Sequence, residues 1–152
     1  MSVPGECGRP CPHRENTLCR EGEFSSWQLV LWPVYSGMHI LIADDNRRIR
    51  EVIKTVLART GATFSECENG SDAVDVYRRE RPDWVLMDIV MERTDGLVAT
   101  RQITSVFPEA RVLIVTNYNA QDLREAAEDA GAKGYILKDN LSEIETFLTA
   151  HG

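Results

Sequence analysis

The sequence predicts an α/β fold in which one parallel sheet carries helices on both faces, a three-layer sandwich. The first observation is that short apolar runs alternate five times with segments whose apolar residues recur at helical spacing. This alternation favours parallel strands joined by right-handed crossovers. The second is the run WVLM at 84–87, which is apolar without alternation, as in a strand covered on both faces. So short a run is also compatible with a buried helix segment.

Composition bounds the class of protein. The chain has 152 residues, of which 43% are hydrophobic and 27% charged, as expected for one soluble domain. Its net charge of -7 argues against affinity for nucleic acid or anionic membranes, because no basic surplus is available to neutralise phosphates. No apolar stretch is long enough to span a bilayer and no signal peptide precedes the domain, so we expect no membrane insertion and a cytoplasmic location.

Residues 1–37 differ from the rest, because prolines and glycines interrupt every periodicity. We expect a poorly ordered leader, with the domain proper at 38–152. Met38 immediately precedes the first strand, so the leader is also compatible with a start codon chosen too far upstream. Thiolates and imidazole are usual zinc ligands, but the spacing fits a zinc site poorly, because no two cysteines are separated by two residues. The residues concerned are Cys7, Cys11, His13 and Cys19.

The first half of the domain reads as strand, helix, strand, helix. A buried-type strand at 39–43 meets an acidic turn, and a helix follows that Gly61 closes. Its expected apolar positions are Ile49, Val52, Ile53, Val56 and Leu57. A half-polar strand at 63–67 precedes a second helix, with Ser71 as its expected N-cap and Pro82 as its stop. The inward positions expected in that helix are Ala73, Val76 and Tyr77.

The second half continues the alternation after the strand at 84–87. Gly96 opens a third helix, which Phe107 and Pro108 close, and a strand at 112–115 follows. A fourth helix stops at Gly131, a strand at 134–137 reads GYIL, and a last helix covers about 141–150. The apolar anchors expected in the third helix are Leu97, Ile103 and Val106, and those in the fourth are Leu123, Ala126, Ala127 and Ala130.

Polar residues follow four of the five strands and would meet at one edge of the sheet, where open α/β sheets bind ligands. These residues are Asp44, Asp45, Asp88, Thr116 and Lys138. Three crowded carboxylates either raise a pKa or recruit a cation, and hard oxygen ligands suit Mg²⁺. Together with the metal, Lys138 and the hydroxyl of Thr116 would neutralise the oxygens of a phosphoryl group during its transfer. Asp88 would supply the attacking oxygen.

In this order the motifs resemble the receiver domain of bacterial two-component response regulators over residues 38 to about 150. The resemblance rests on the strand-end residues, on Met91 and Asp95-Gly96 after Asp88, and on GYILKD at 134–139. It implies a flavodoxin-like, doubly wound (βα)5 fold with a parallel sheet of order 2-1-3-4-5. It also implies that Asp88 accepts a phosphoryl group from a histidine kinase or histidine phosphotransfer protein.

The resemblance further assigns roles at the site. Asp45, Asp88 and the backbone carbonyl of Val90 would hold Mg²⁺, Asp44 would act through water, and Lys138 would contact the phosphate. The hydroxyl of Thr116 would turn to the acyl phosphate while Tyr135 moves inward behind it. The output is then a population shift driven by the new dianionic group.

Four positions depart from the family pattern or tune its rates. Glu92 stands where receivers usually carry proline, and Asn117 is bulkier than the small residue often found there. Val90 and Tyr118 occupy positions that tune hydrolysis of the acyl phosphate in the family. Because Val90 is apolar and Tyr118 is bulky, we expect poor positioning of the attacking water and a long-lived phosphorylated state.

We therefore expect a stand-alone receiver that acts as a switch and turns over no separate substrate. Its output would pass to a downstream protein effector, without direct nucleic-acid binding, and a phosphorylation-dependent dimer is left open. One alternative is the receiver part of a truncated DNA-binding transcription regulator. Another is a pseudo-receiver that binds partners without phosphorylation. A nucleotide-binding protein is disfavoured, because DDNRR after the first strand is acidic rather than glycine-rich.

Overall fold

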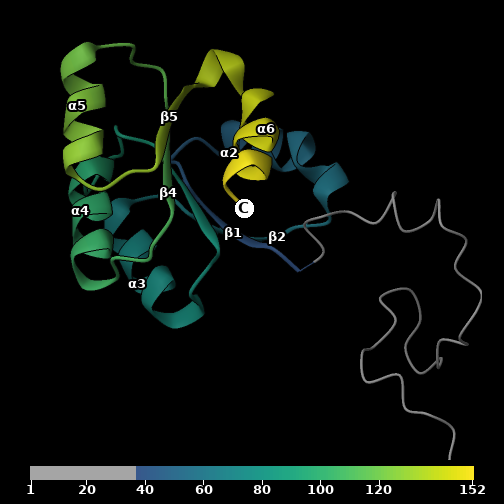
Figure 1. The fold of residues 1–152 in the computed structure, drawn as a ribbon, viewed down its shortest axis with the longest axis horizontal. Coiled ribbons are helices and arrows are strands. Elements are labelled where there is room, and N and C mark those ends of the chain that lie inside the picture. Colours follow the sequence, from purple (N-terminus) through teal and green to yellow (C-terminus); the bar gives the residue numbers. More distant parts are fainter. Residues whose placement is uncertain (1–36) are drawn as a thin grey trace, which may run out of the picture. The chain divides into compact units, whose positions relative to one another are not determined.

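The computed structural model describes residues 37–152, which form a five-stranded parallel sheet of order β2-β1-β3-β4-β5 (Figure 1). The strands are β1 (His39–Ala43), β2 (Thr63–Cys67), β3 (Trp84–Met87), β4 (Val112–Thr116) and β5 (Gly134–Leu137). The helices are α2 (Arg47–Val56), α3 (Gly70–Glu80), α4 (Gly96–Val106), α5 (Gln121–Asp129) and α6 (Glu143–His151). The expected flavodoxin-like fold is confirmed. The expectations for the leader and for zinc at Cys7, Cys11, His13 and Cys19 lie outside the described residues.

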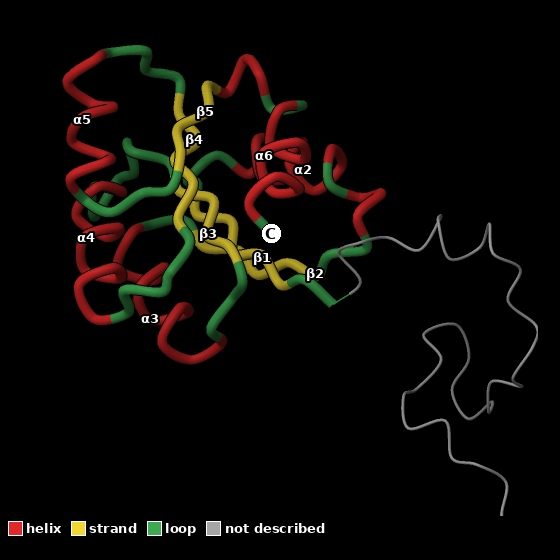
Figure 2. Tube along the Cα trace, viewed as in Figure 1, coloured by secondary structure: helices red, strands yellow, loops and turns green. Residues whose placement is uncertain are grey.

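Helices α3, α4 and α5 cover one face of the sheet, and α2 and α6 cover the other (Figures 1 and 2). Alternate strand residues serve the two layers, as the pleat requires. Leu41 packs with the α3–α4–α5 layer, whereas its neighbours Ile40 and Ile42 pack with the α2–α6 layer. All four residues of β3 are buried, so the run at 84–87 is a central strand rather than a helix segment.

Helices α2, α3 and α4 start at local side-chain caps. Asn46 accepts a hydrogen bond from the backbone N–H of Arg48 and opens α2, and Asp95 accepts from Leu97 and opens α4. Helix α3 begins earlier than expected. Its N-cap is Asn69, whose side chain accepts from the N–H of Asp72, so the expectation of Ser71 as the cap is wrong.

Two apolar residues that were expected to pack against the sheet are exposed instead. Val52 is 45% exposed and Val106 is 55% exposed. Val52 adjoins the buried Ile53, so it points about 100° away around the helix and out of the core. Val106 is the last residue of α4. Helix α2 is also shorter than expected, because it ends at Val56 and a 3₁₀ turn (Ala58–Thr60) fills the gap before the left-handed Gly61.

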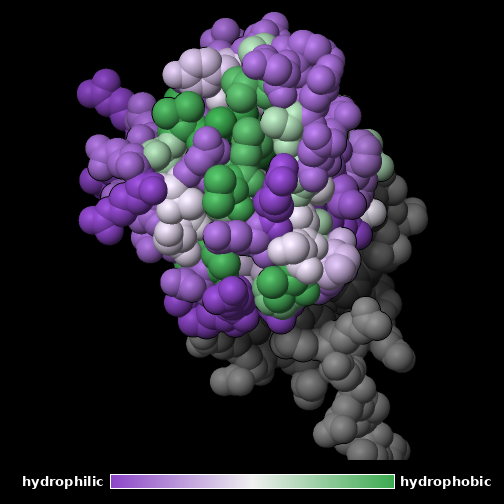
Figure 3. Space-filling view, turned by 90° about the vertical axis from the view of Figure 1, so that its left-hand side faces the viewer, coloured by the Kyte–Doolittle hydropathy of each residue, from purple (hydrophilic) through white to green (hydrophobic). Residues whose placement is uncertain are grey.

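Figure 3 faces the α3–α4–α5 layer and shows apolar side chains gathered among polar ones. A shallow groove of about 310 Å³ lies there, lined by Leu97, Val98, Arg101, Gln102, Ser105 and Ala126. Among residues 37–152, no helix combines the length and the hydrophobicity that crossing a bilayer requires.

Candidate functional site

The parallel register brings four strand ends to one edge of the sheet. Residue pairs Ala43–Met87 and Thr116–Leu137 lie side by side on neighbouring strands. The residue after each of β1, β3 and β5 is therefore delivered to the same edge, and Thr116 ends β4 there. The backbone N–H of Asp88 also donates to the carbonyl of Ala43 at 2.9 Å, which extends the pairing of β1 and β3 to the site itself.

Lys138 bridges two buried carboxylates at this edge. Its Nζ lies 2.7 Å from Asp44 Oδ2 and 2.8 Å from Asp88 Oδ2, and all three side chains are at most 6% exposed. Burial alone would lower the pKa of Lys138, but the hydrogen bonds to Asp44 and Asp88 outweigh it and raise that pKa. Burial raises the pKa of Asp44, against the opposing hydrogen bond from Lys138. The lysine is therefore held as a cation between the two acids.

Backbone amides fix the other oxygen of each buried carboxylate. Asp88 Oδ1 accepts from the N–H of Ile89 at 2.8 Å, and Asp44 Oδ1 accepts from the N–H of Asn46 at 2.8 Å. The loop after Asp88 closes where the N–H of Gly96 donates to the carbonyl of Ile89 at 2.8 Å. Both carboxylates are thus preorganised by backbone and lysine together.

The donor set fits a divalent cation such as Mg²⁺. Asp44, Asp45 and Asp88 each offer a carboxylate oxygen, and these oxygens all lie within 4.8 Å of one another. Asp44 and Asp88 are buried, whereas Asp45 is exposed. Even with Lys138 between them, three carboxylates leave an excess of negative charge, and Mg²⁺ prefers carboxylate oxygens with open positions for water.

Thr116 and Tyr135 lie beside the site but make their hydrogen bonds elsewhere. Thr116 is fully buried, and its hydroxyl accepts from the N–H of Tyr118 at 3.5 Å. The hydroxyl of Tyr135 donates to the carbonyl of Tyr118 at 2.7 Å, and the Arg124 guanidinium carbon lies 4.5 Å from the Tyr135 ring centroid. Within residues 37–152 neither side chain bonds to Asp88.

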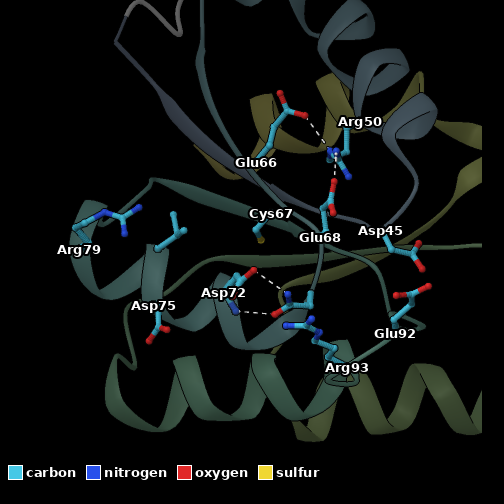
Figure 4. A pocket seen from close by; sticks show the side chains of 12 residues that line it. Asp45, Arg50, Glu66, Cys67, Glu68, Asp72, Asp75, Arg79, Glu92 and Arg93 are labelled. Atoms are coloured by element: carbon cyan, nitrogen blue, oxygen red, sulfur yellow. Dashed lines mark hydrogen bonds and ion pairs between the residues drawn. The ribbon is translucent and has the colours of Figure 1, made fainter.

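The four expected rate-tuning residues all lie at the surface. Val90 is 53% exposed and Tyr118 is 50% exposed, and Asn117 and Glu92 are also exposed. Glu92 lines a groove of about 840 Å³ whose wall includes Asp45. In Figure 4 the carboxylates of Asp45 and Glu92 lie near each other at one end of this groove.

Arg50 is a site residue that the sequence pattern did not single out. Its side chain is 7% exposed, and its Nη1 donates to the backbone carbonyl of Asp44 at 2.6 Å. Its Nε and Nη2 bond to Glu66 and Glu68 at 2.9 Å and 3.0 Å. A signal was present, because Arg50 stands three residues before Ile53 on the inward face of α2. A charged residue on such a face needs partners.

Comparison with known proteins agrees with this geometry. The sequence model of the response regulator receiver domain matches residues 40–149. The chemotaxis protein CheY of Bacillus subtilis is 38% identical over 100 residues, which cover 65% of this chain and 83% of that protein. The response regulator MprA of Mycolicibacterium vanbaalenii is 35% identical over 101 residues, 66% of this chain. That match covers only 44% of MprA, so the chain spans less than half of the longer relative.

A solved structure is similar in fold as well as in sequence. It is the crystal structure of a two-component response regulator of the LuxR family from Aurantimonas sp. SI85-9A1, at 30% identity. The two superpose with a TM-score of 0.71 over 76% of this chain and 84% of the other.

Proposed function

The chain belongs to the response regulator receiver domain family, and from this premise we propose that it is a phosphorylation-dependent switch with Asp88 as the phosphoacceptor. Receiver domains are switches of response regulators rather than enzymes with a separate substrate. The observation that carries the proposal is the buried Asp88 carboxylate, which is bonded to Lys138 at 2.8 Å and lies beside Asp44 and Asp45.

The reaction is transfer of a phosphoryl group from a phosphohistidine on a histidine kinase or histidine phosphotransfer protein. A carboxylate oxygen of Asp88 forms a bond to phosphorus while the bond from phosphorus to the imidazole nitrogen breaks. The imidazole, protonated on its other ring nitrogen, leaves with the electron pair and ends as neutral histidine. Lys138 already contacts Asp88 Oδ2, so a short movement of its Nζ pairs it with a phosphoryl oxygen.

Asp45, Asp88 and the backbone carbonyl of Val90 would hold Mg²⁺ directly, and Asp44 would hold it through water. When bound, the metal supplies positive charge that neutralises the phosphoryl oxygens. The chain's own contribution is to fix the carboxylates in advance, through the amides of Ile89 and Asn46. This preorganisation is supported by the geometry of the donor set, in which the three carboxylates converge.

The switch proposed here links the phosphoryl group to Thr116 and Tyr135. The hydroxyl of Thr116 would leave the amide of Tyr118 and bond to the acyl phosphate, and Tyr135 would leave the carbonyl of Tyr118 and move inward. Both residues share Tyr118 as a partner, so a movement of the loop after β4 affects both. The phosphoryl group shifts the population towards the second arrangement, because it bonds differently in the two.

We propose that output passes to a downstream protein effector through surfaces remodelled by this shift. The match to this chain covers 44% of MprA, which supports a second candidate function. In that case the chain is the receiver part of a DNA-binding regulator. Glu92 and Asn117 give limited support to a third, a pseudo-receiver that is never phosphorylated. A longer native gene would favour the second, and failure to take up phosphate would favour the third.

The exposed side chains around Asp88 set the proposed lifetime of the acyl phosphate. Val90 is apolar and Tyr118 is bulky, and both are exposed, so we infer that they position the attacking water poorly. Glu92 adds negative charge near Asp45. We expect slow hydrolysis of the phosphorylated form. A half-life of only seconds in the presence of Mg²⁺ contradicts this part of the proposal.

The proposal is tested by incubating the protein with Mg²⁺ and a small acyl-phosphate donor and measuring its intact mass. Addition of one phosphoryl group is expected, and Asp88→Asn is expected to prevent it. Asp75→Asn is the matched control, since Asp75 is an exposed carboxylate of α3. No added phosphoryl group with any donor would leave the pseudo-receiver as the better account.

A further inference from the structure

Arg50 is a buried cation on α2 and has a bond from every nitrogen of its guanidinium group. Nε and Nη2 bond to Glu66 and Glu68, which lie at and just beyond the end of the edge strand β2. Figure 4 shows both ion pairs as dashed lines. Nη1 bonds to the Asp44 carbonyl oxygen at 2.6 Å. The two glutamates hold the guanidinium in place, and its Nη1 is directed at the backbone of the acidic turn.

The hydrogen bond to Asp44 fixes more than one residue. The carbonyl of Asp44 belongs to the planar peptide group that also contains the nitrogen and Cα of Asp45. Fixing that oxygen therefore fixes the plane from which Asp45 departs. Asp44 is held independently of Arg50. Its carboxylate contacts Lys138 and accepts from the N–H of Asn46, and its backbone N–H donates to the carbonyl of Cys67. Asp45 is exposed, so its placement depends chiefly on its backbone.

We propose that Arg50 is a positioning residue that orients Asp45 for Mg²⁺, with Glu66 and Glu68 holding its guanidinium group. The inference rests on the proposed function and adds a positioning residue to the three carboxylates and Lys138. Arginine is suited to the task because its planar fork directs several donors at once. Lysine has one charged nitrogen on a flexible chain and cannot hold the same three partners in fixed directions.

The test is Arg50→Lys, which keeps the positive charge and loses the fork. Mg²⁺ is titrated into the full chain and the amide chemical shifts of Asn46 and Ile89 are followed by ¹H–¹⁵N NMR. We expect the Mg²⁺ dissociation constant to rise about tenfold, as for loss of groups that orient metal ligands. Phosphorylation of Asp88 is expected to fall more at limiting than at saturating Mg²⁺, because the substitution weakens metal binding and leaves Asp88 and Lys138 in place.

A merely structural role predicts a different result. Arg50→Lys would then lower the unfolding temperature but leave the Mg²⁺ dissociation constant of the folded protein unchanged, and this result overturns the inference. If Arg50→Lys does not fold, the pair Glu66→Gln and Glu68→Gln removes the anchors of the guanidinium group and takes its place. The same weakening of Mg²⁺ binding is expected in that double variant, and an unchanged dissociation constant overturns the inference equally.

Arg79→Lys is the matched control. Arg79 and Arg50 both line the groove of about 840 Å³ described above. Arg79 pairs with Glu80 and is bonded to neither Asp44 nor Asp45. Its substitution is expected to leave Mg²⁺ binding unchanged. The two proposals fail separately: an unmodified chain that takes up no phosphoryl group contradicts the proposed function. An unmodified chain that does so, with Mg²⁺ affinity unaltered by Arg50→Lys, contradicts only the role of Arg50.

Discussion

A Cβ atom on Gly96 would lie 1.8 Å from the carbonyl oxygen of Asp88. The first residue of α4 therefore packs directly on the backbone of the proposed phosphoacceptor. The same atom would also lie 2.8 Å from the Asp88 carbonyl carbon and 3.0 Å from Met87 Cγ. Only glycine allows this approach, and the contact ties the position of Asp88 to the start of α4.

Gly96→Ala is expected to destabilise the protein, because backbone rather than a flexible side chain must move to accept the methyl group. The expected loss is about 2 kcal/mol in the free energy of unfolding, which is typical of overpacking, and urea denaturation measures it. Val98→Ala, at a residue 49% exposed on the same helix, is the control and should change stability little. Equal stability of Gly96→Ala and the unmodified protein would contradict the contact.

Lys138→Met is expected to destabilise the metal-free protein, because Asp44 and Asp88 would remain buried without their shared cation. Removing one partner of a buried ion pair costs about 3 kcal/mol or more. The measurement is urea denaturation in the presence of a chelator, with exposed Lys133→Met as the control. A loss no greater than that of the control would show that Lys138 does not stabilise the two carboxylates.

The fold was predictable from the sequence because its signals are local. Hydrophobic periodicity and the polar residues after the strands identify the elements. A parallel sheet then brings together four of these residues at one edge: Asp44, Asp88, Thr116 and Lys138. The ion pairs of Lys138 with two carboxylates agree with that prediction. The resemblance supplied the strand order, which the structure confirms.

Several features were not predictable, because they depend on contacts between distant segments. Arg50 gains its role from Glu66 and Glu68, which the fold brings alongside. Tyr135 and Thr116 share Tyr118 as a partner only after β4 and β5 pair. The predictions of some helix boundaries and of the burial of Val106 were also wrong, since periodicity alone does not say where a helix ends.

Tyr135→Phe is expected to loosen the loop after β4, because it removes the hydrogen bond from the hydroxyl to the carbonyl of Tyr118. The cost to global stability is small, about 1 kcal/mol or less, since the freed carbonyl is accessible to water. Hydrogen exchange of residues 116–120 should become faster, whereas exchange in β1 should not change. Unaltered exchange at 116–120 would show that the bond does not hold the loop.

Cys67 is expected to resist thiol reagents in the folded protein. Burial raises the pKa of its thiol to about 12, from an ordinary value of 9.0, so the thiolate is about 1000-fold scarcer at pH 8. Labelling with iodoacetamide followed by peptide mapping measures the rate at this position. The rate should rise with pH and reach the ordinary rate in urea. Rapid labelling of Cys67 at pH 8 in the folded protein would contradict its burial.

The central claim is that Asp88 carries the phosphoryl group, and locating the modified residue tests it most directly. The protein is incubated with Mg²⁺ and an acyl-phosphate donor, then reduced with borohydride, which converts an aspartyl phosphate to homoserine. Peptide mapping is expected to find homoserine at position 88 and aspartate at positions 44 and 45. Homoserine at another position, or no conversion in a folded protein, would contradict the account.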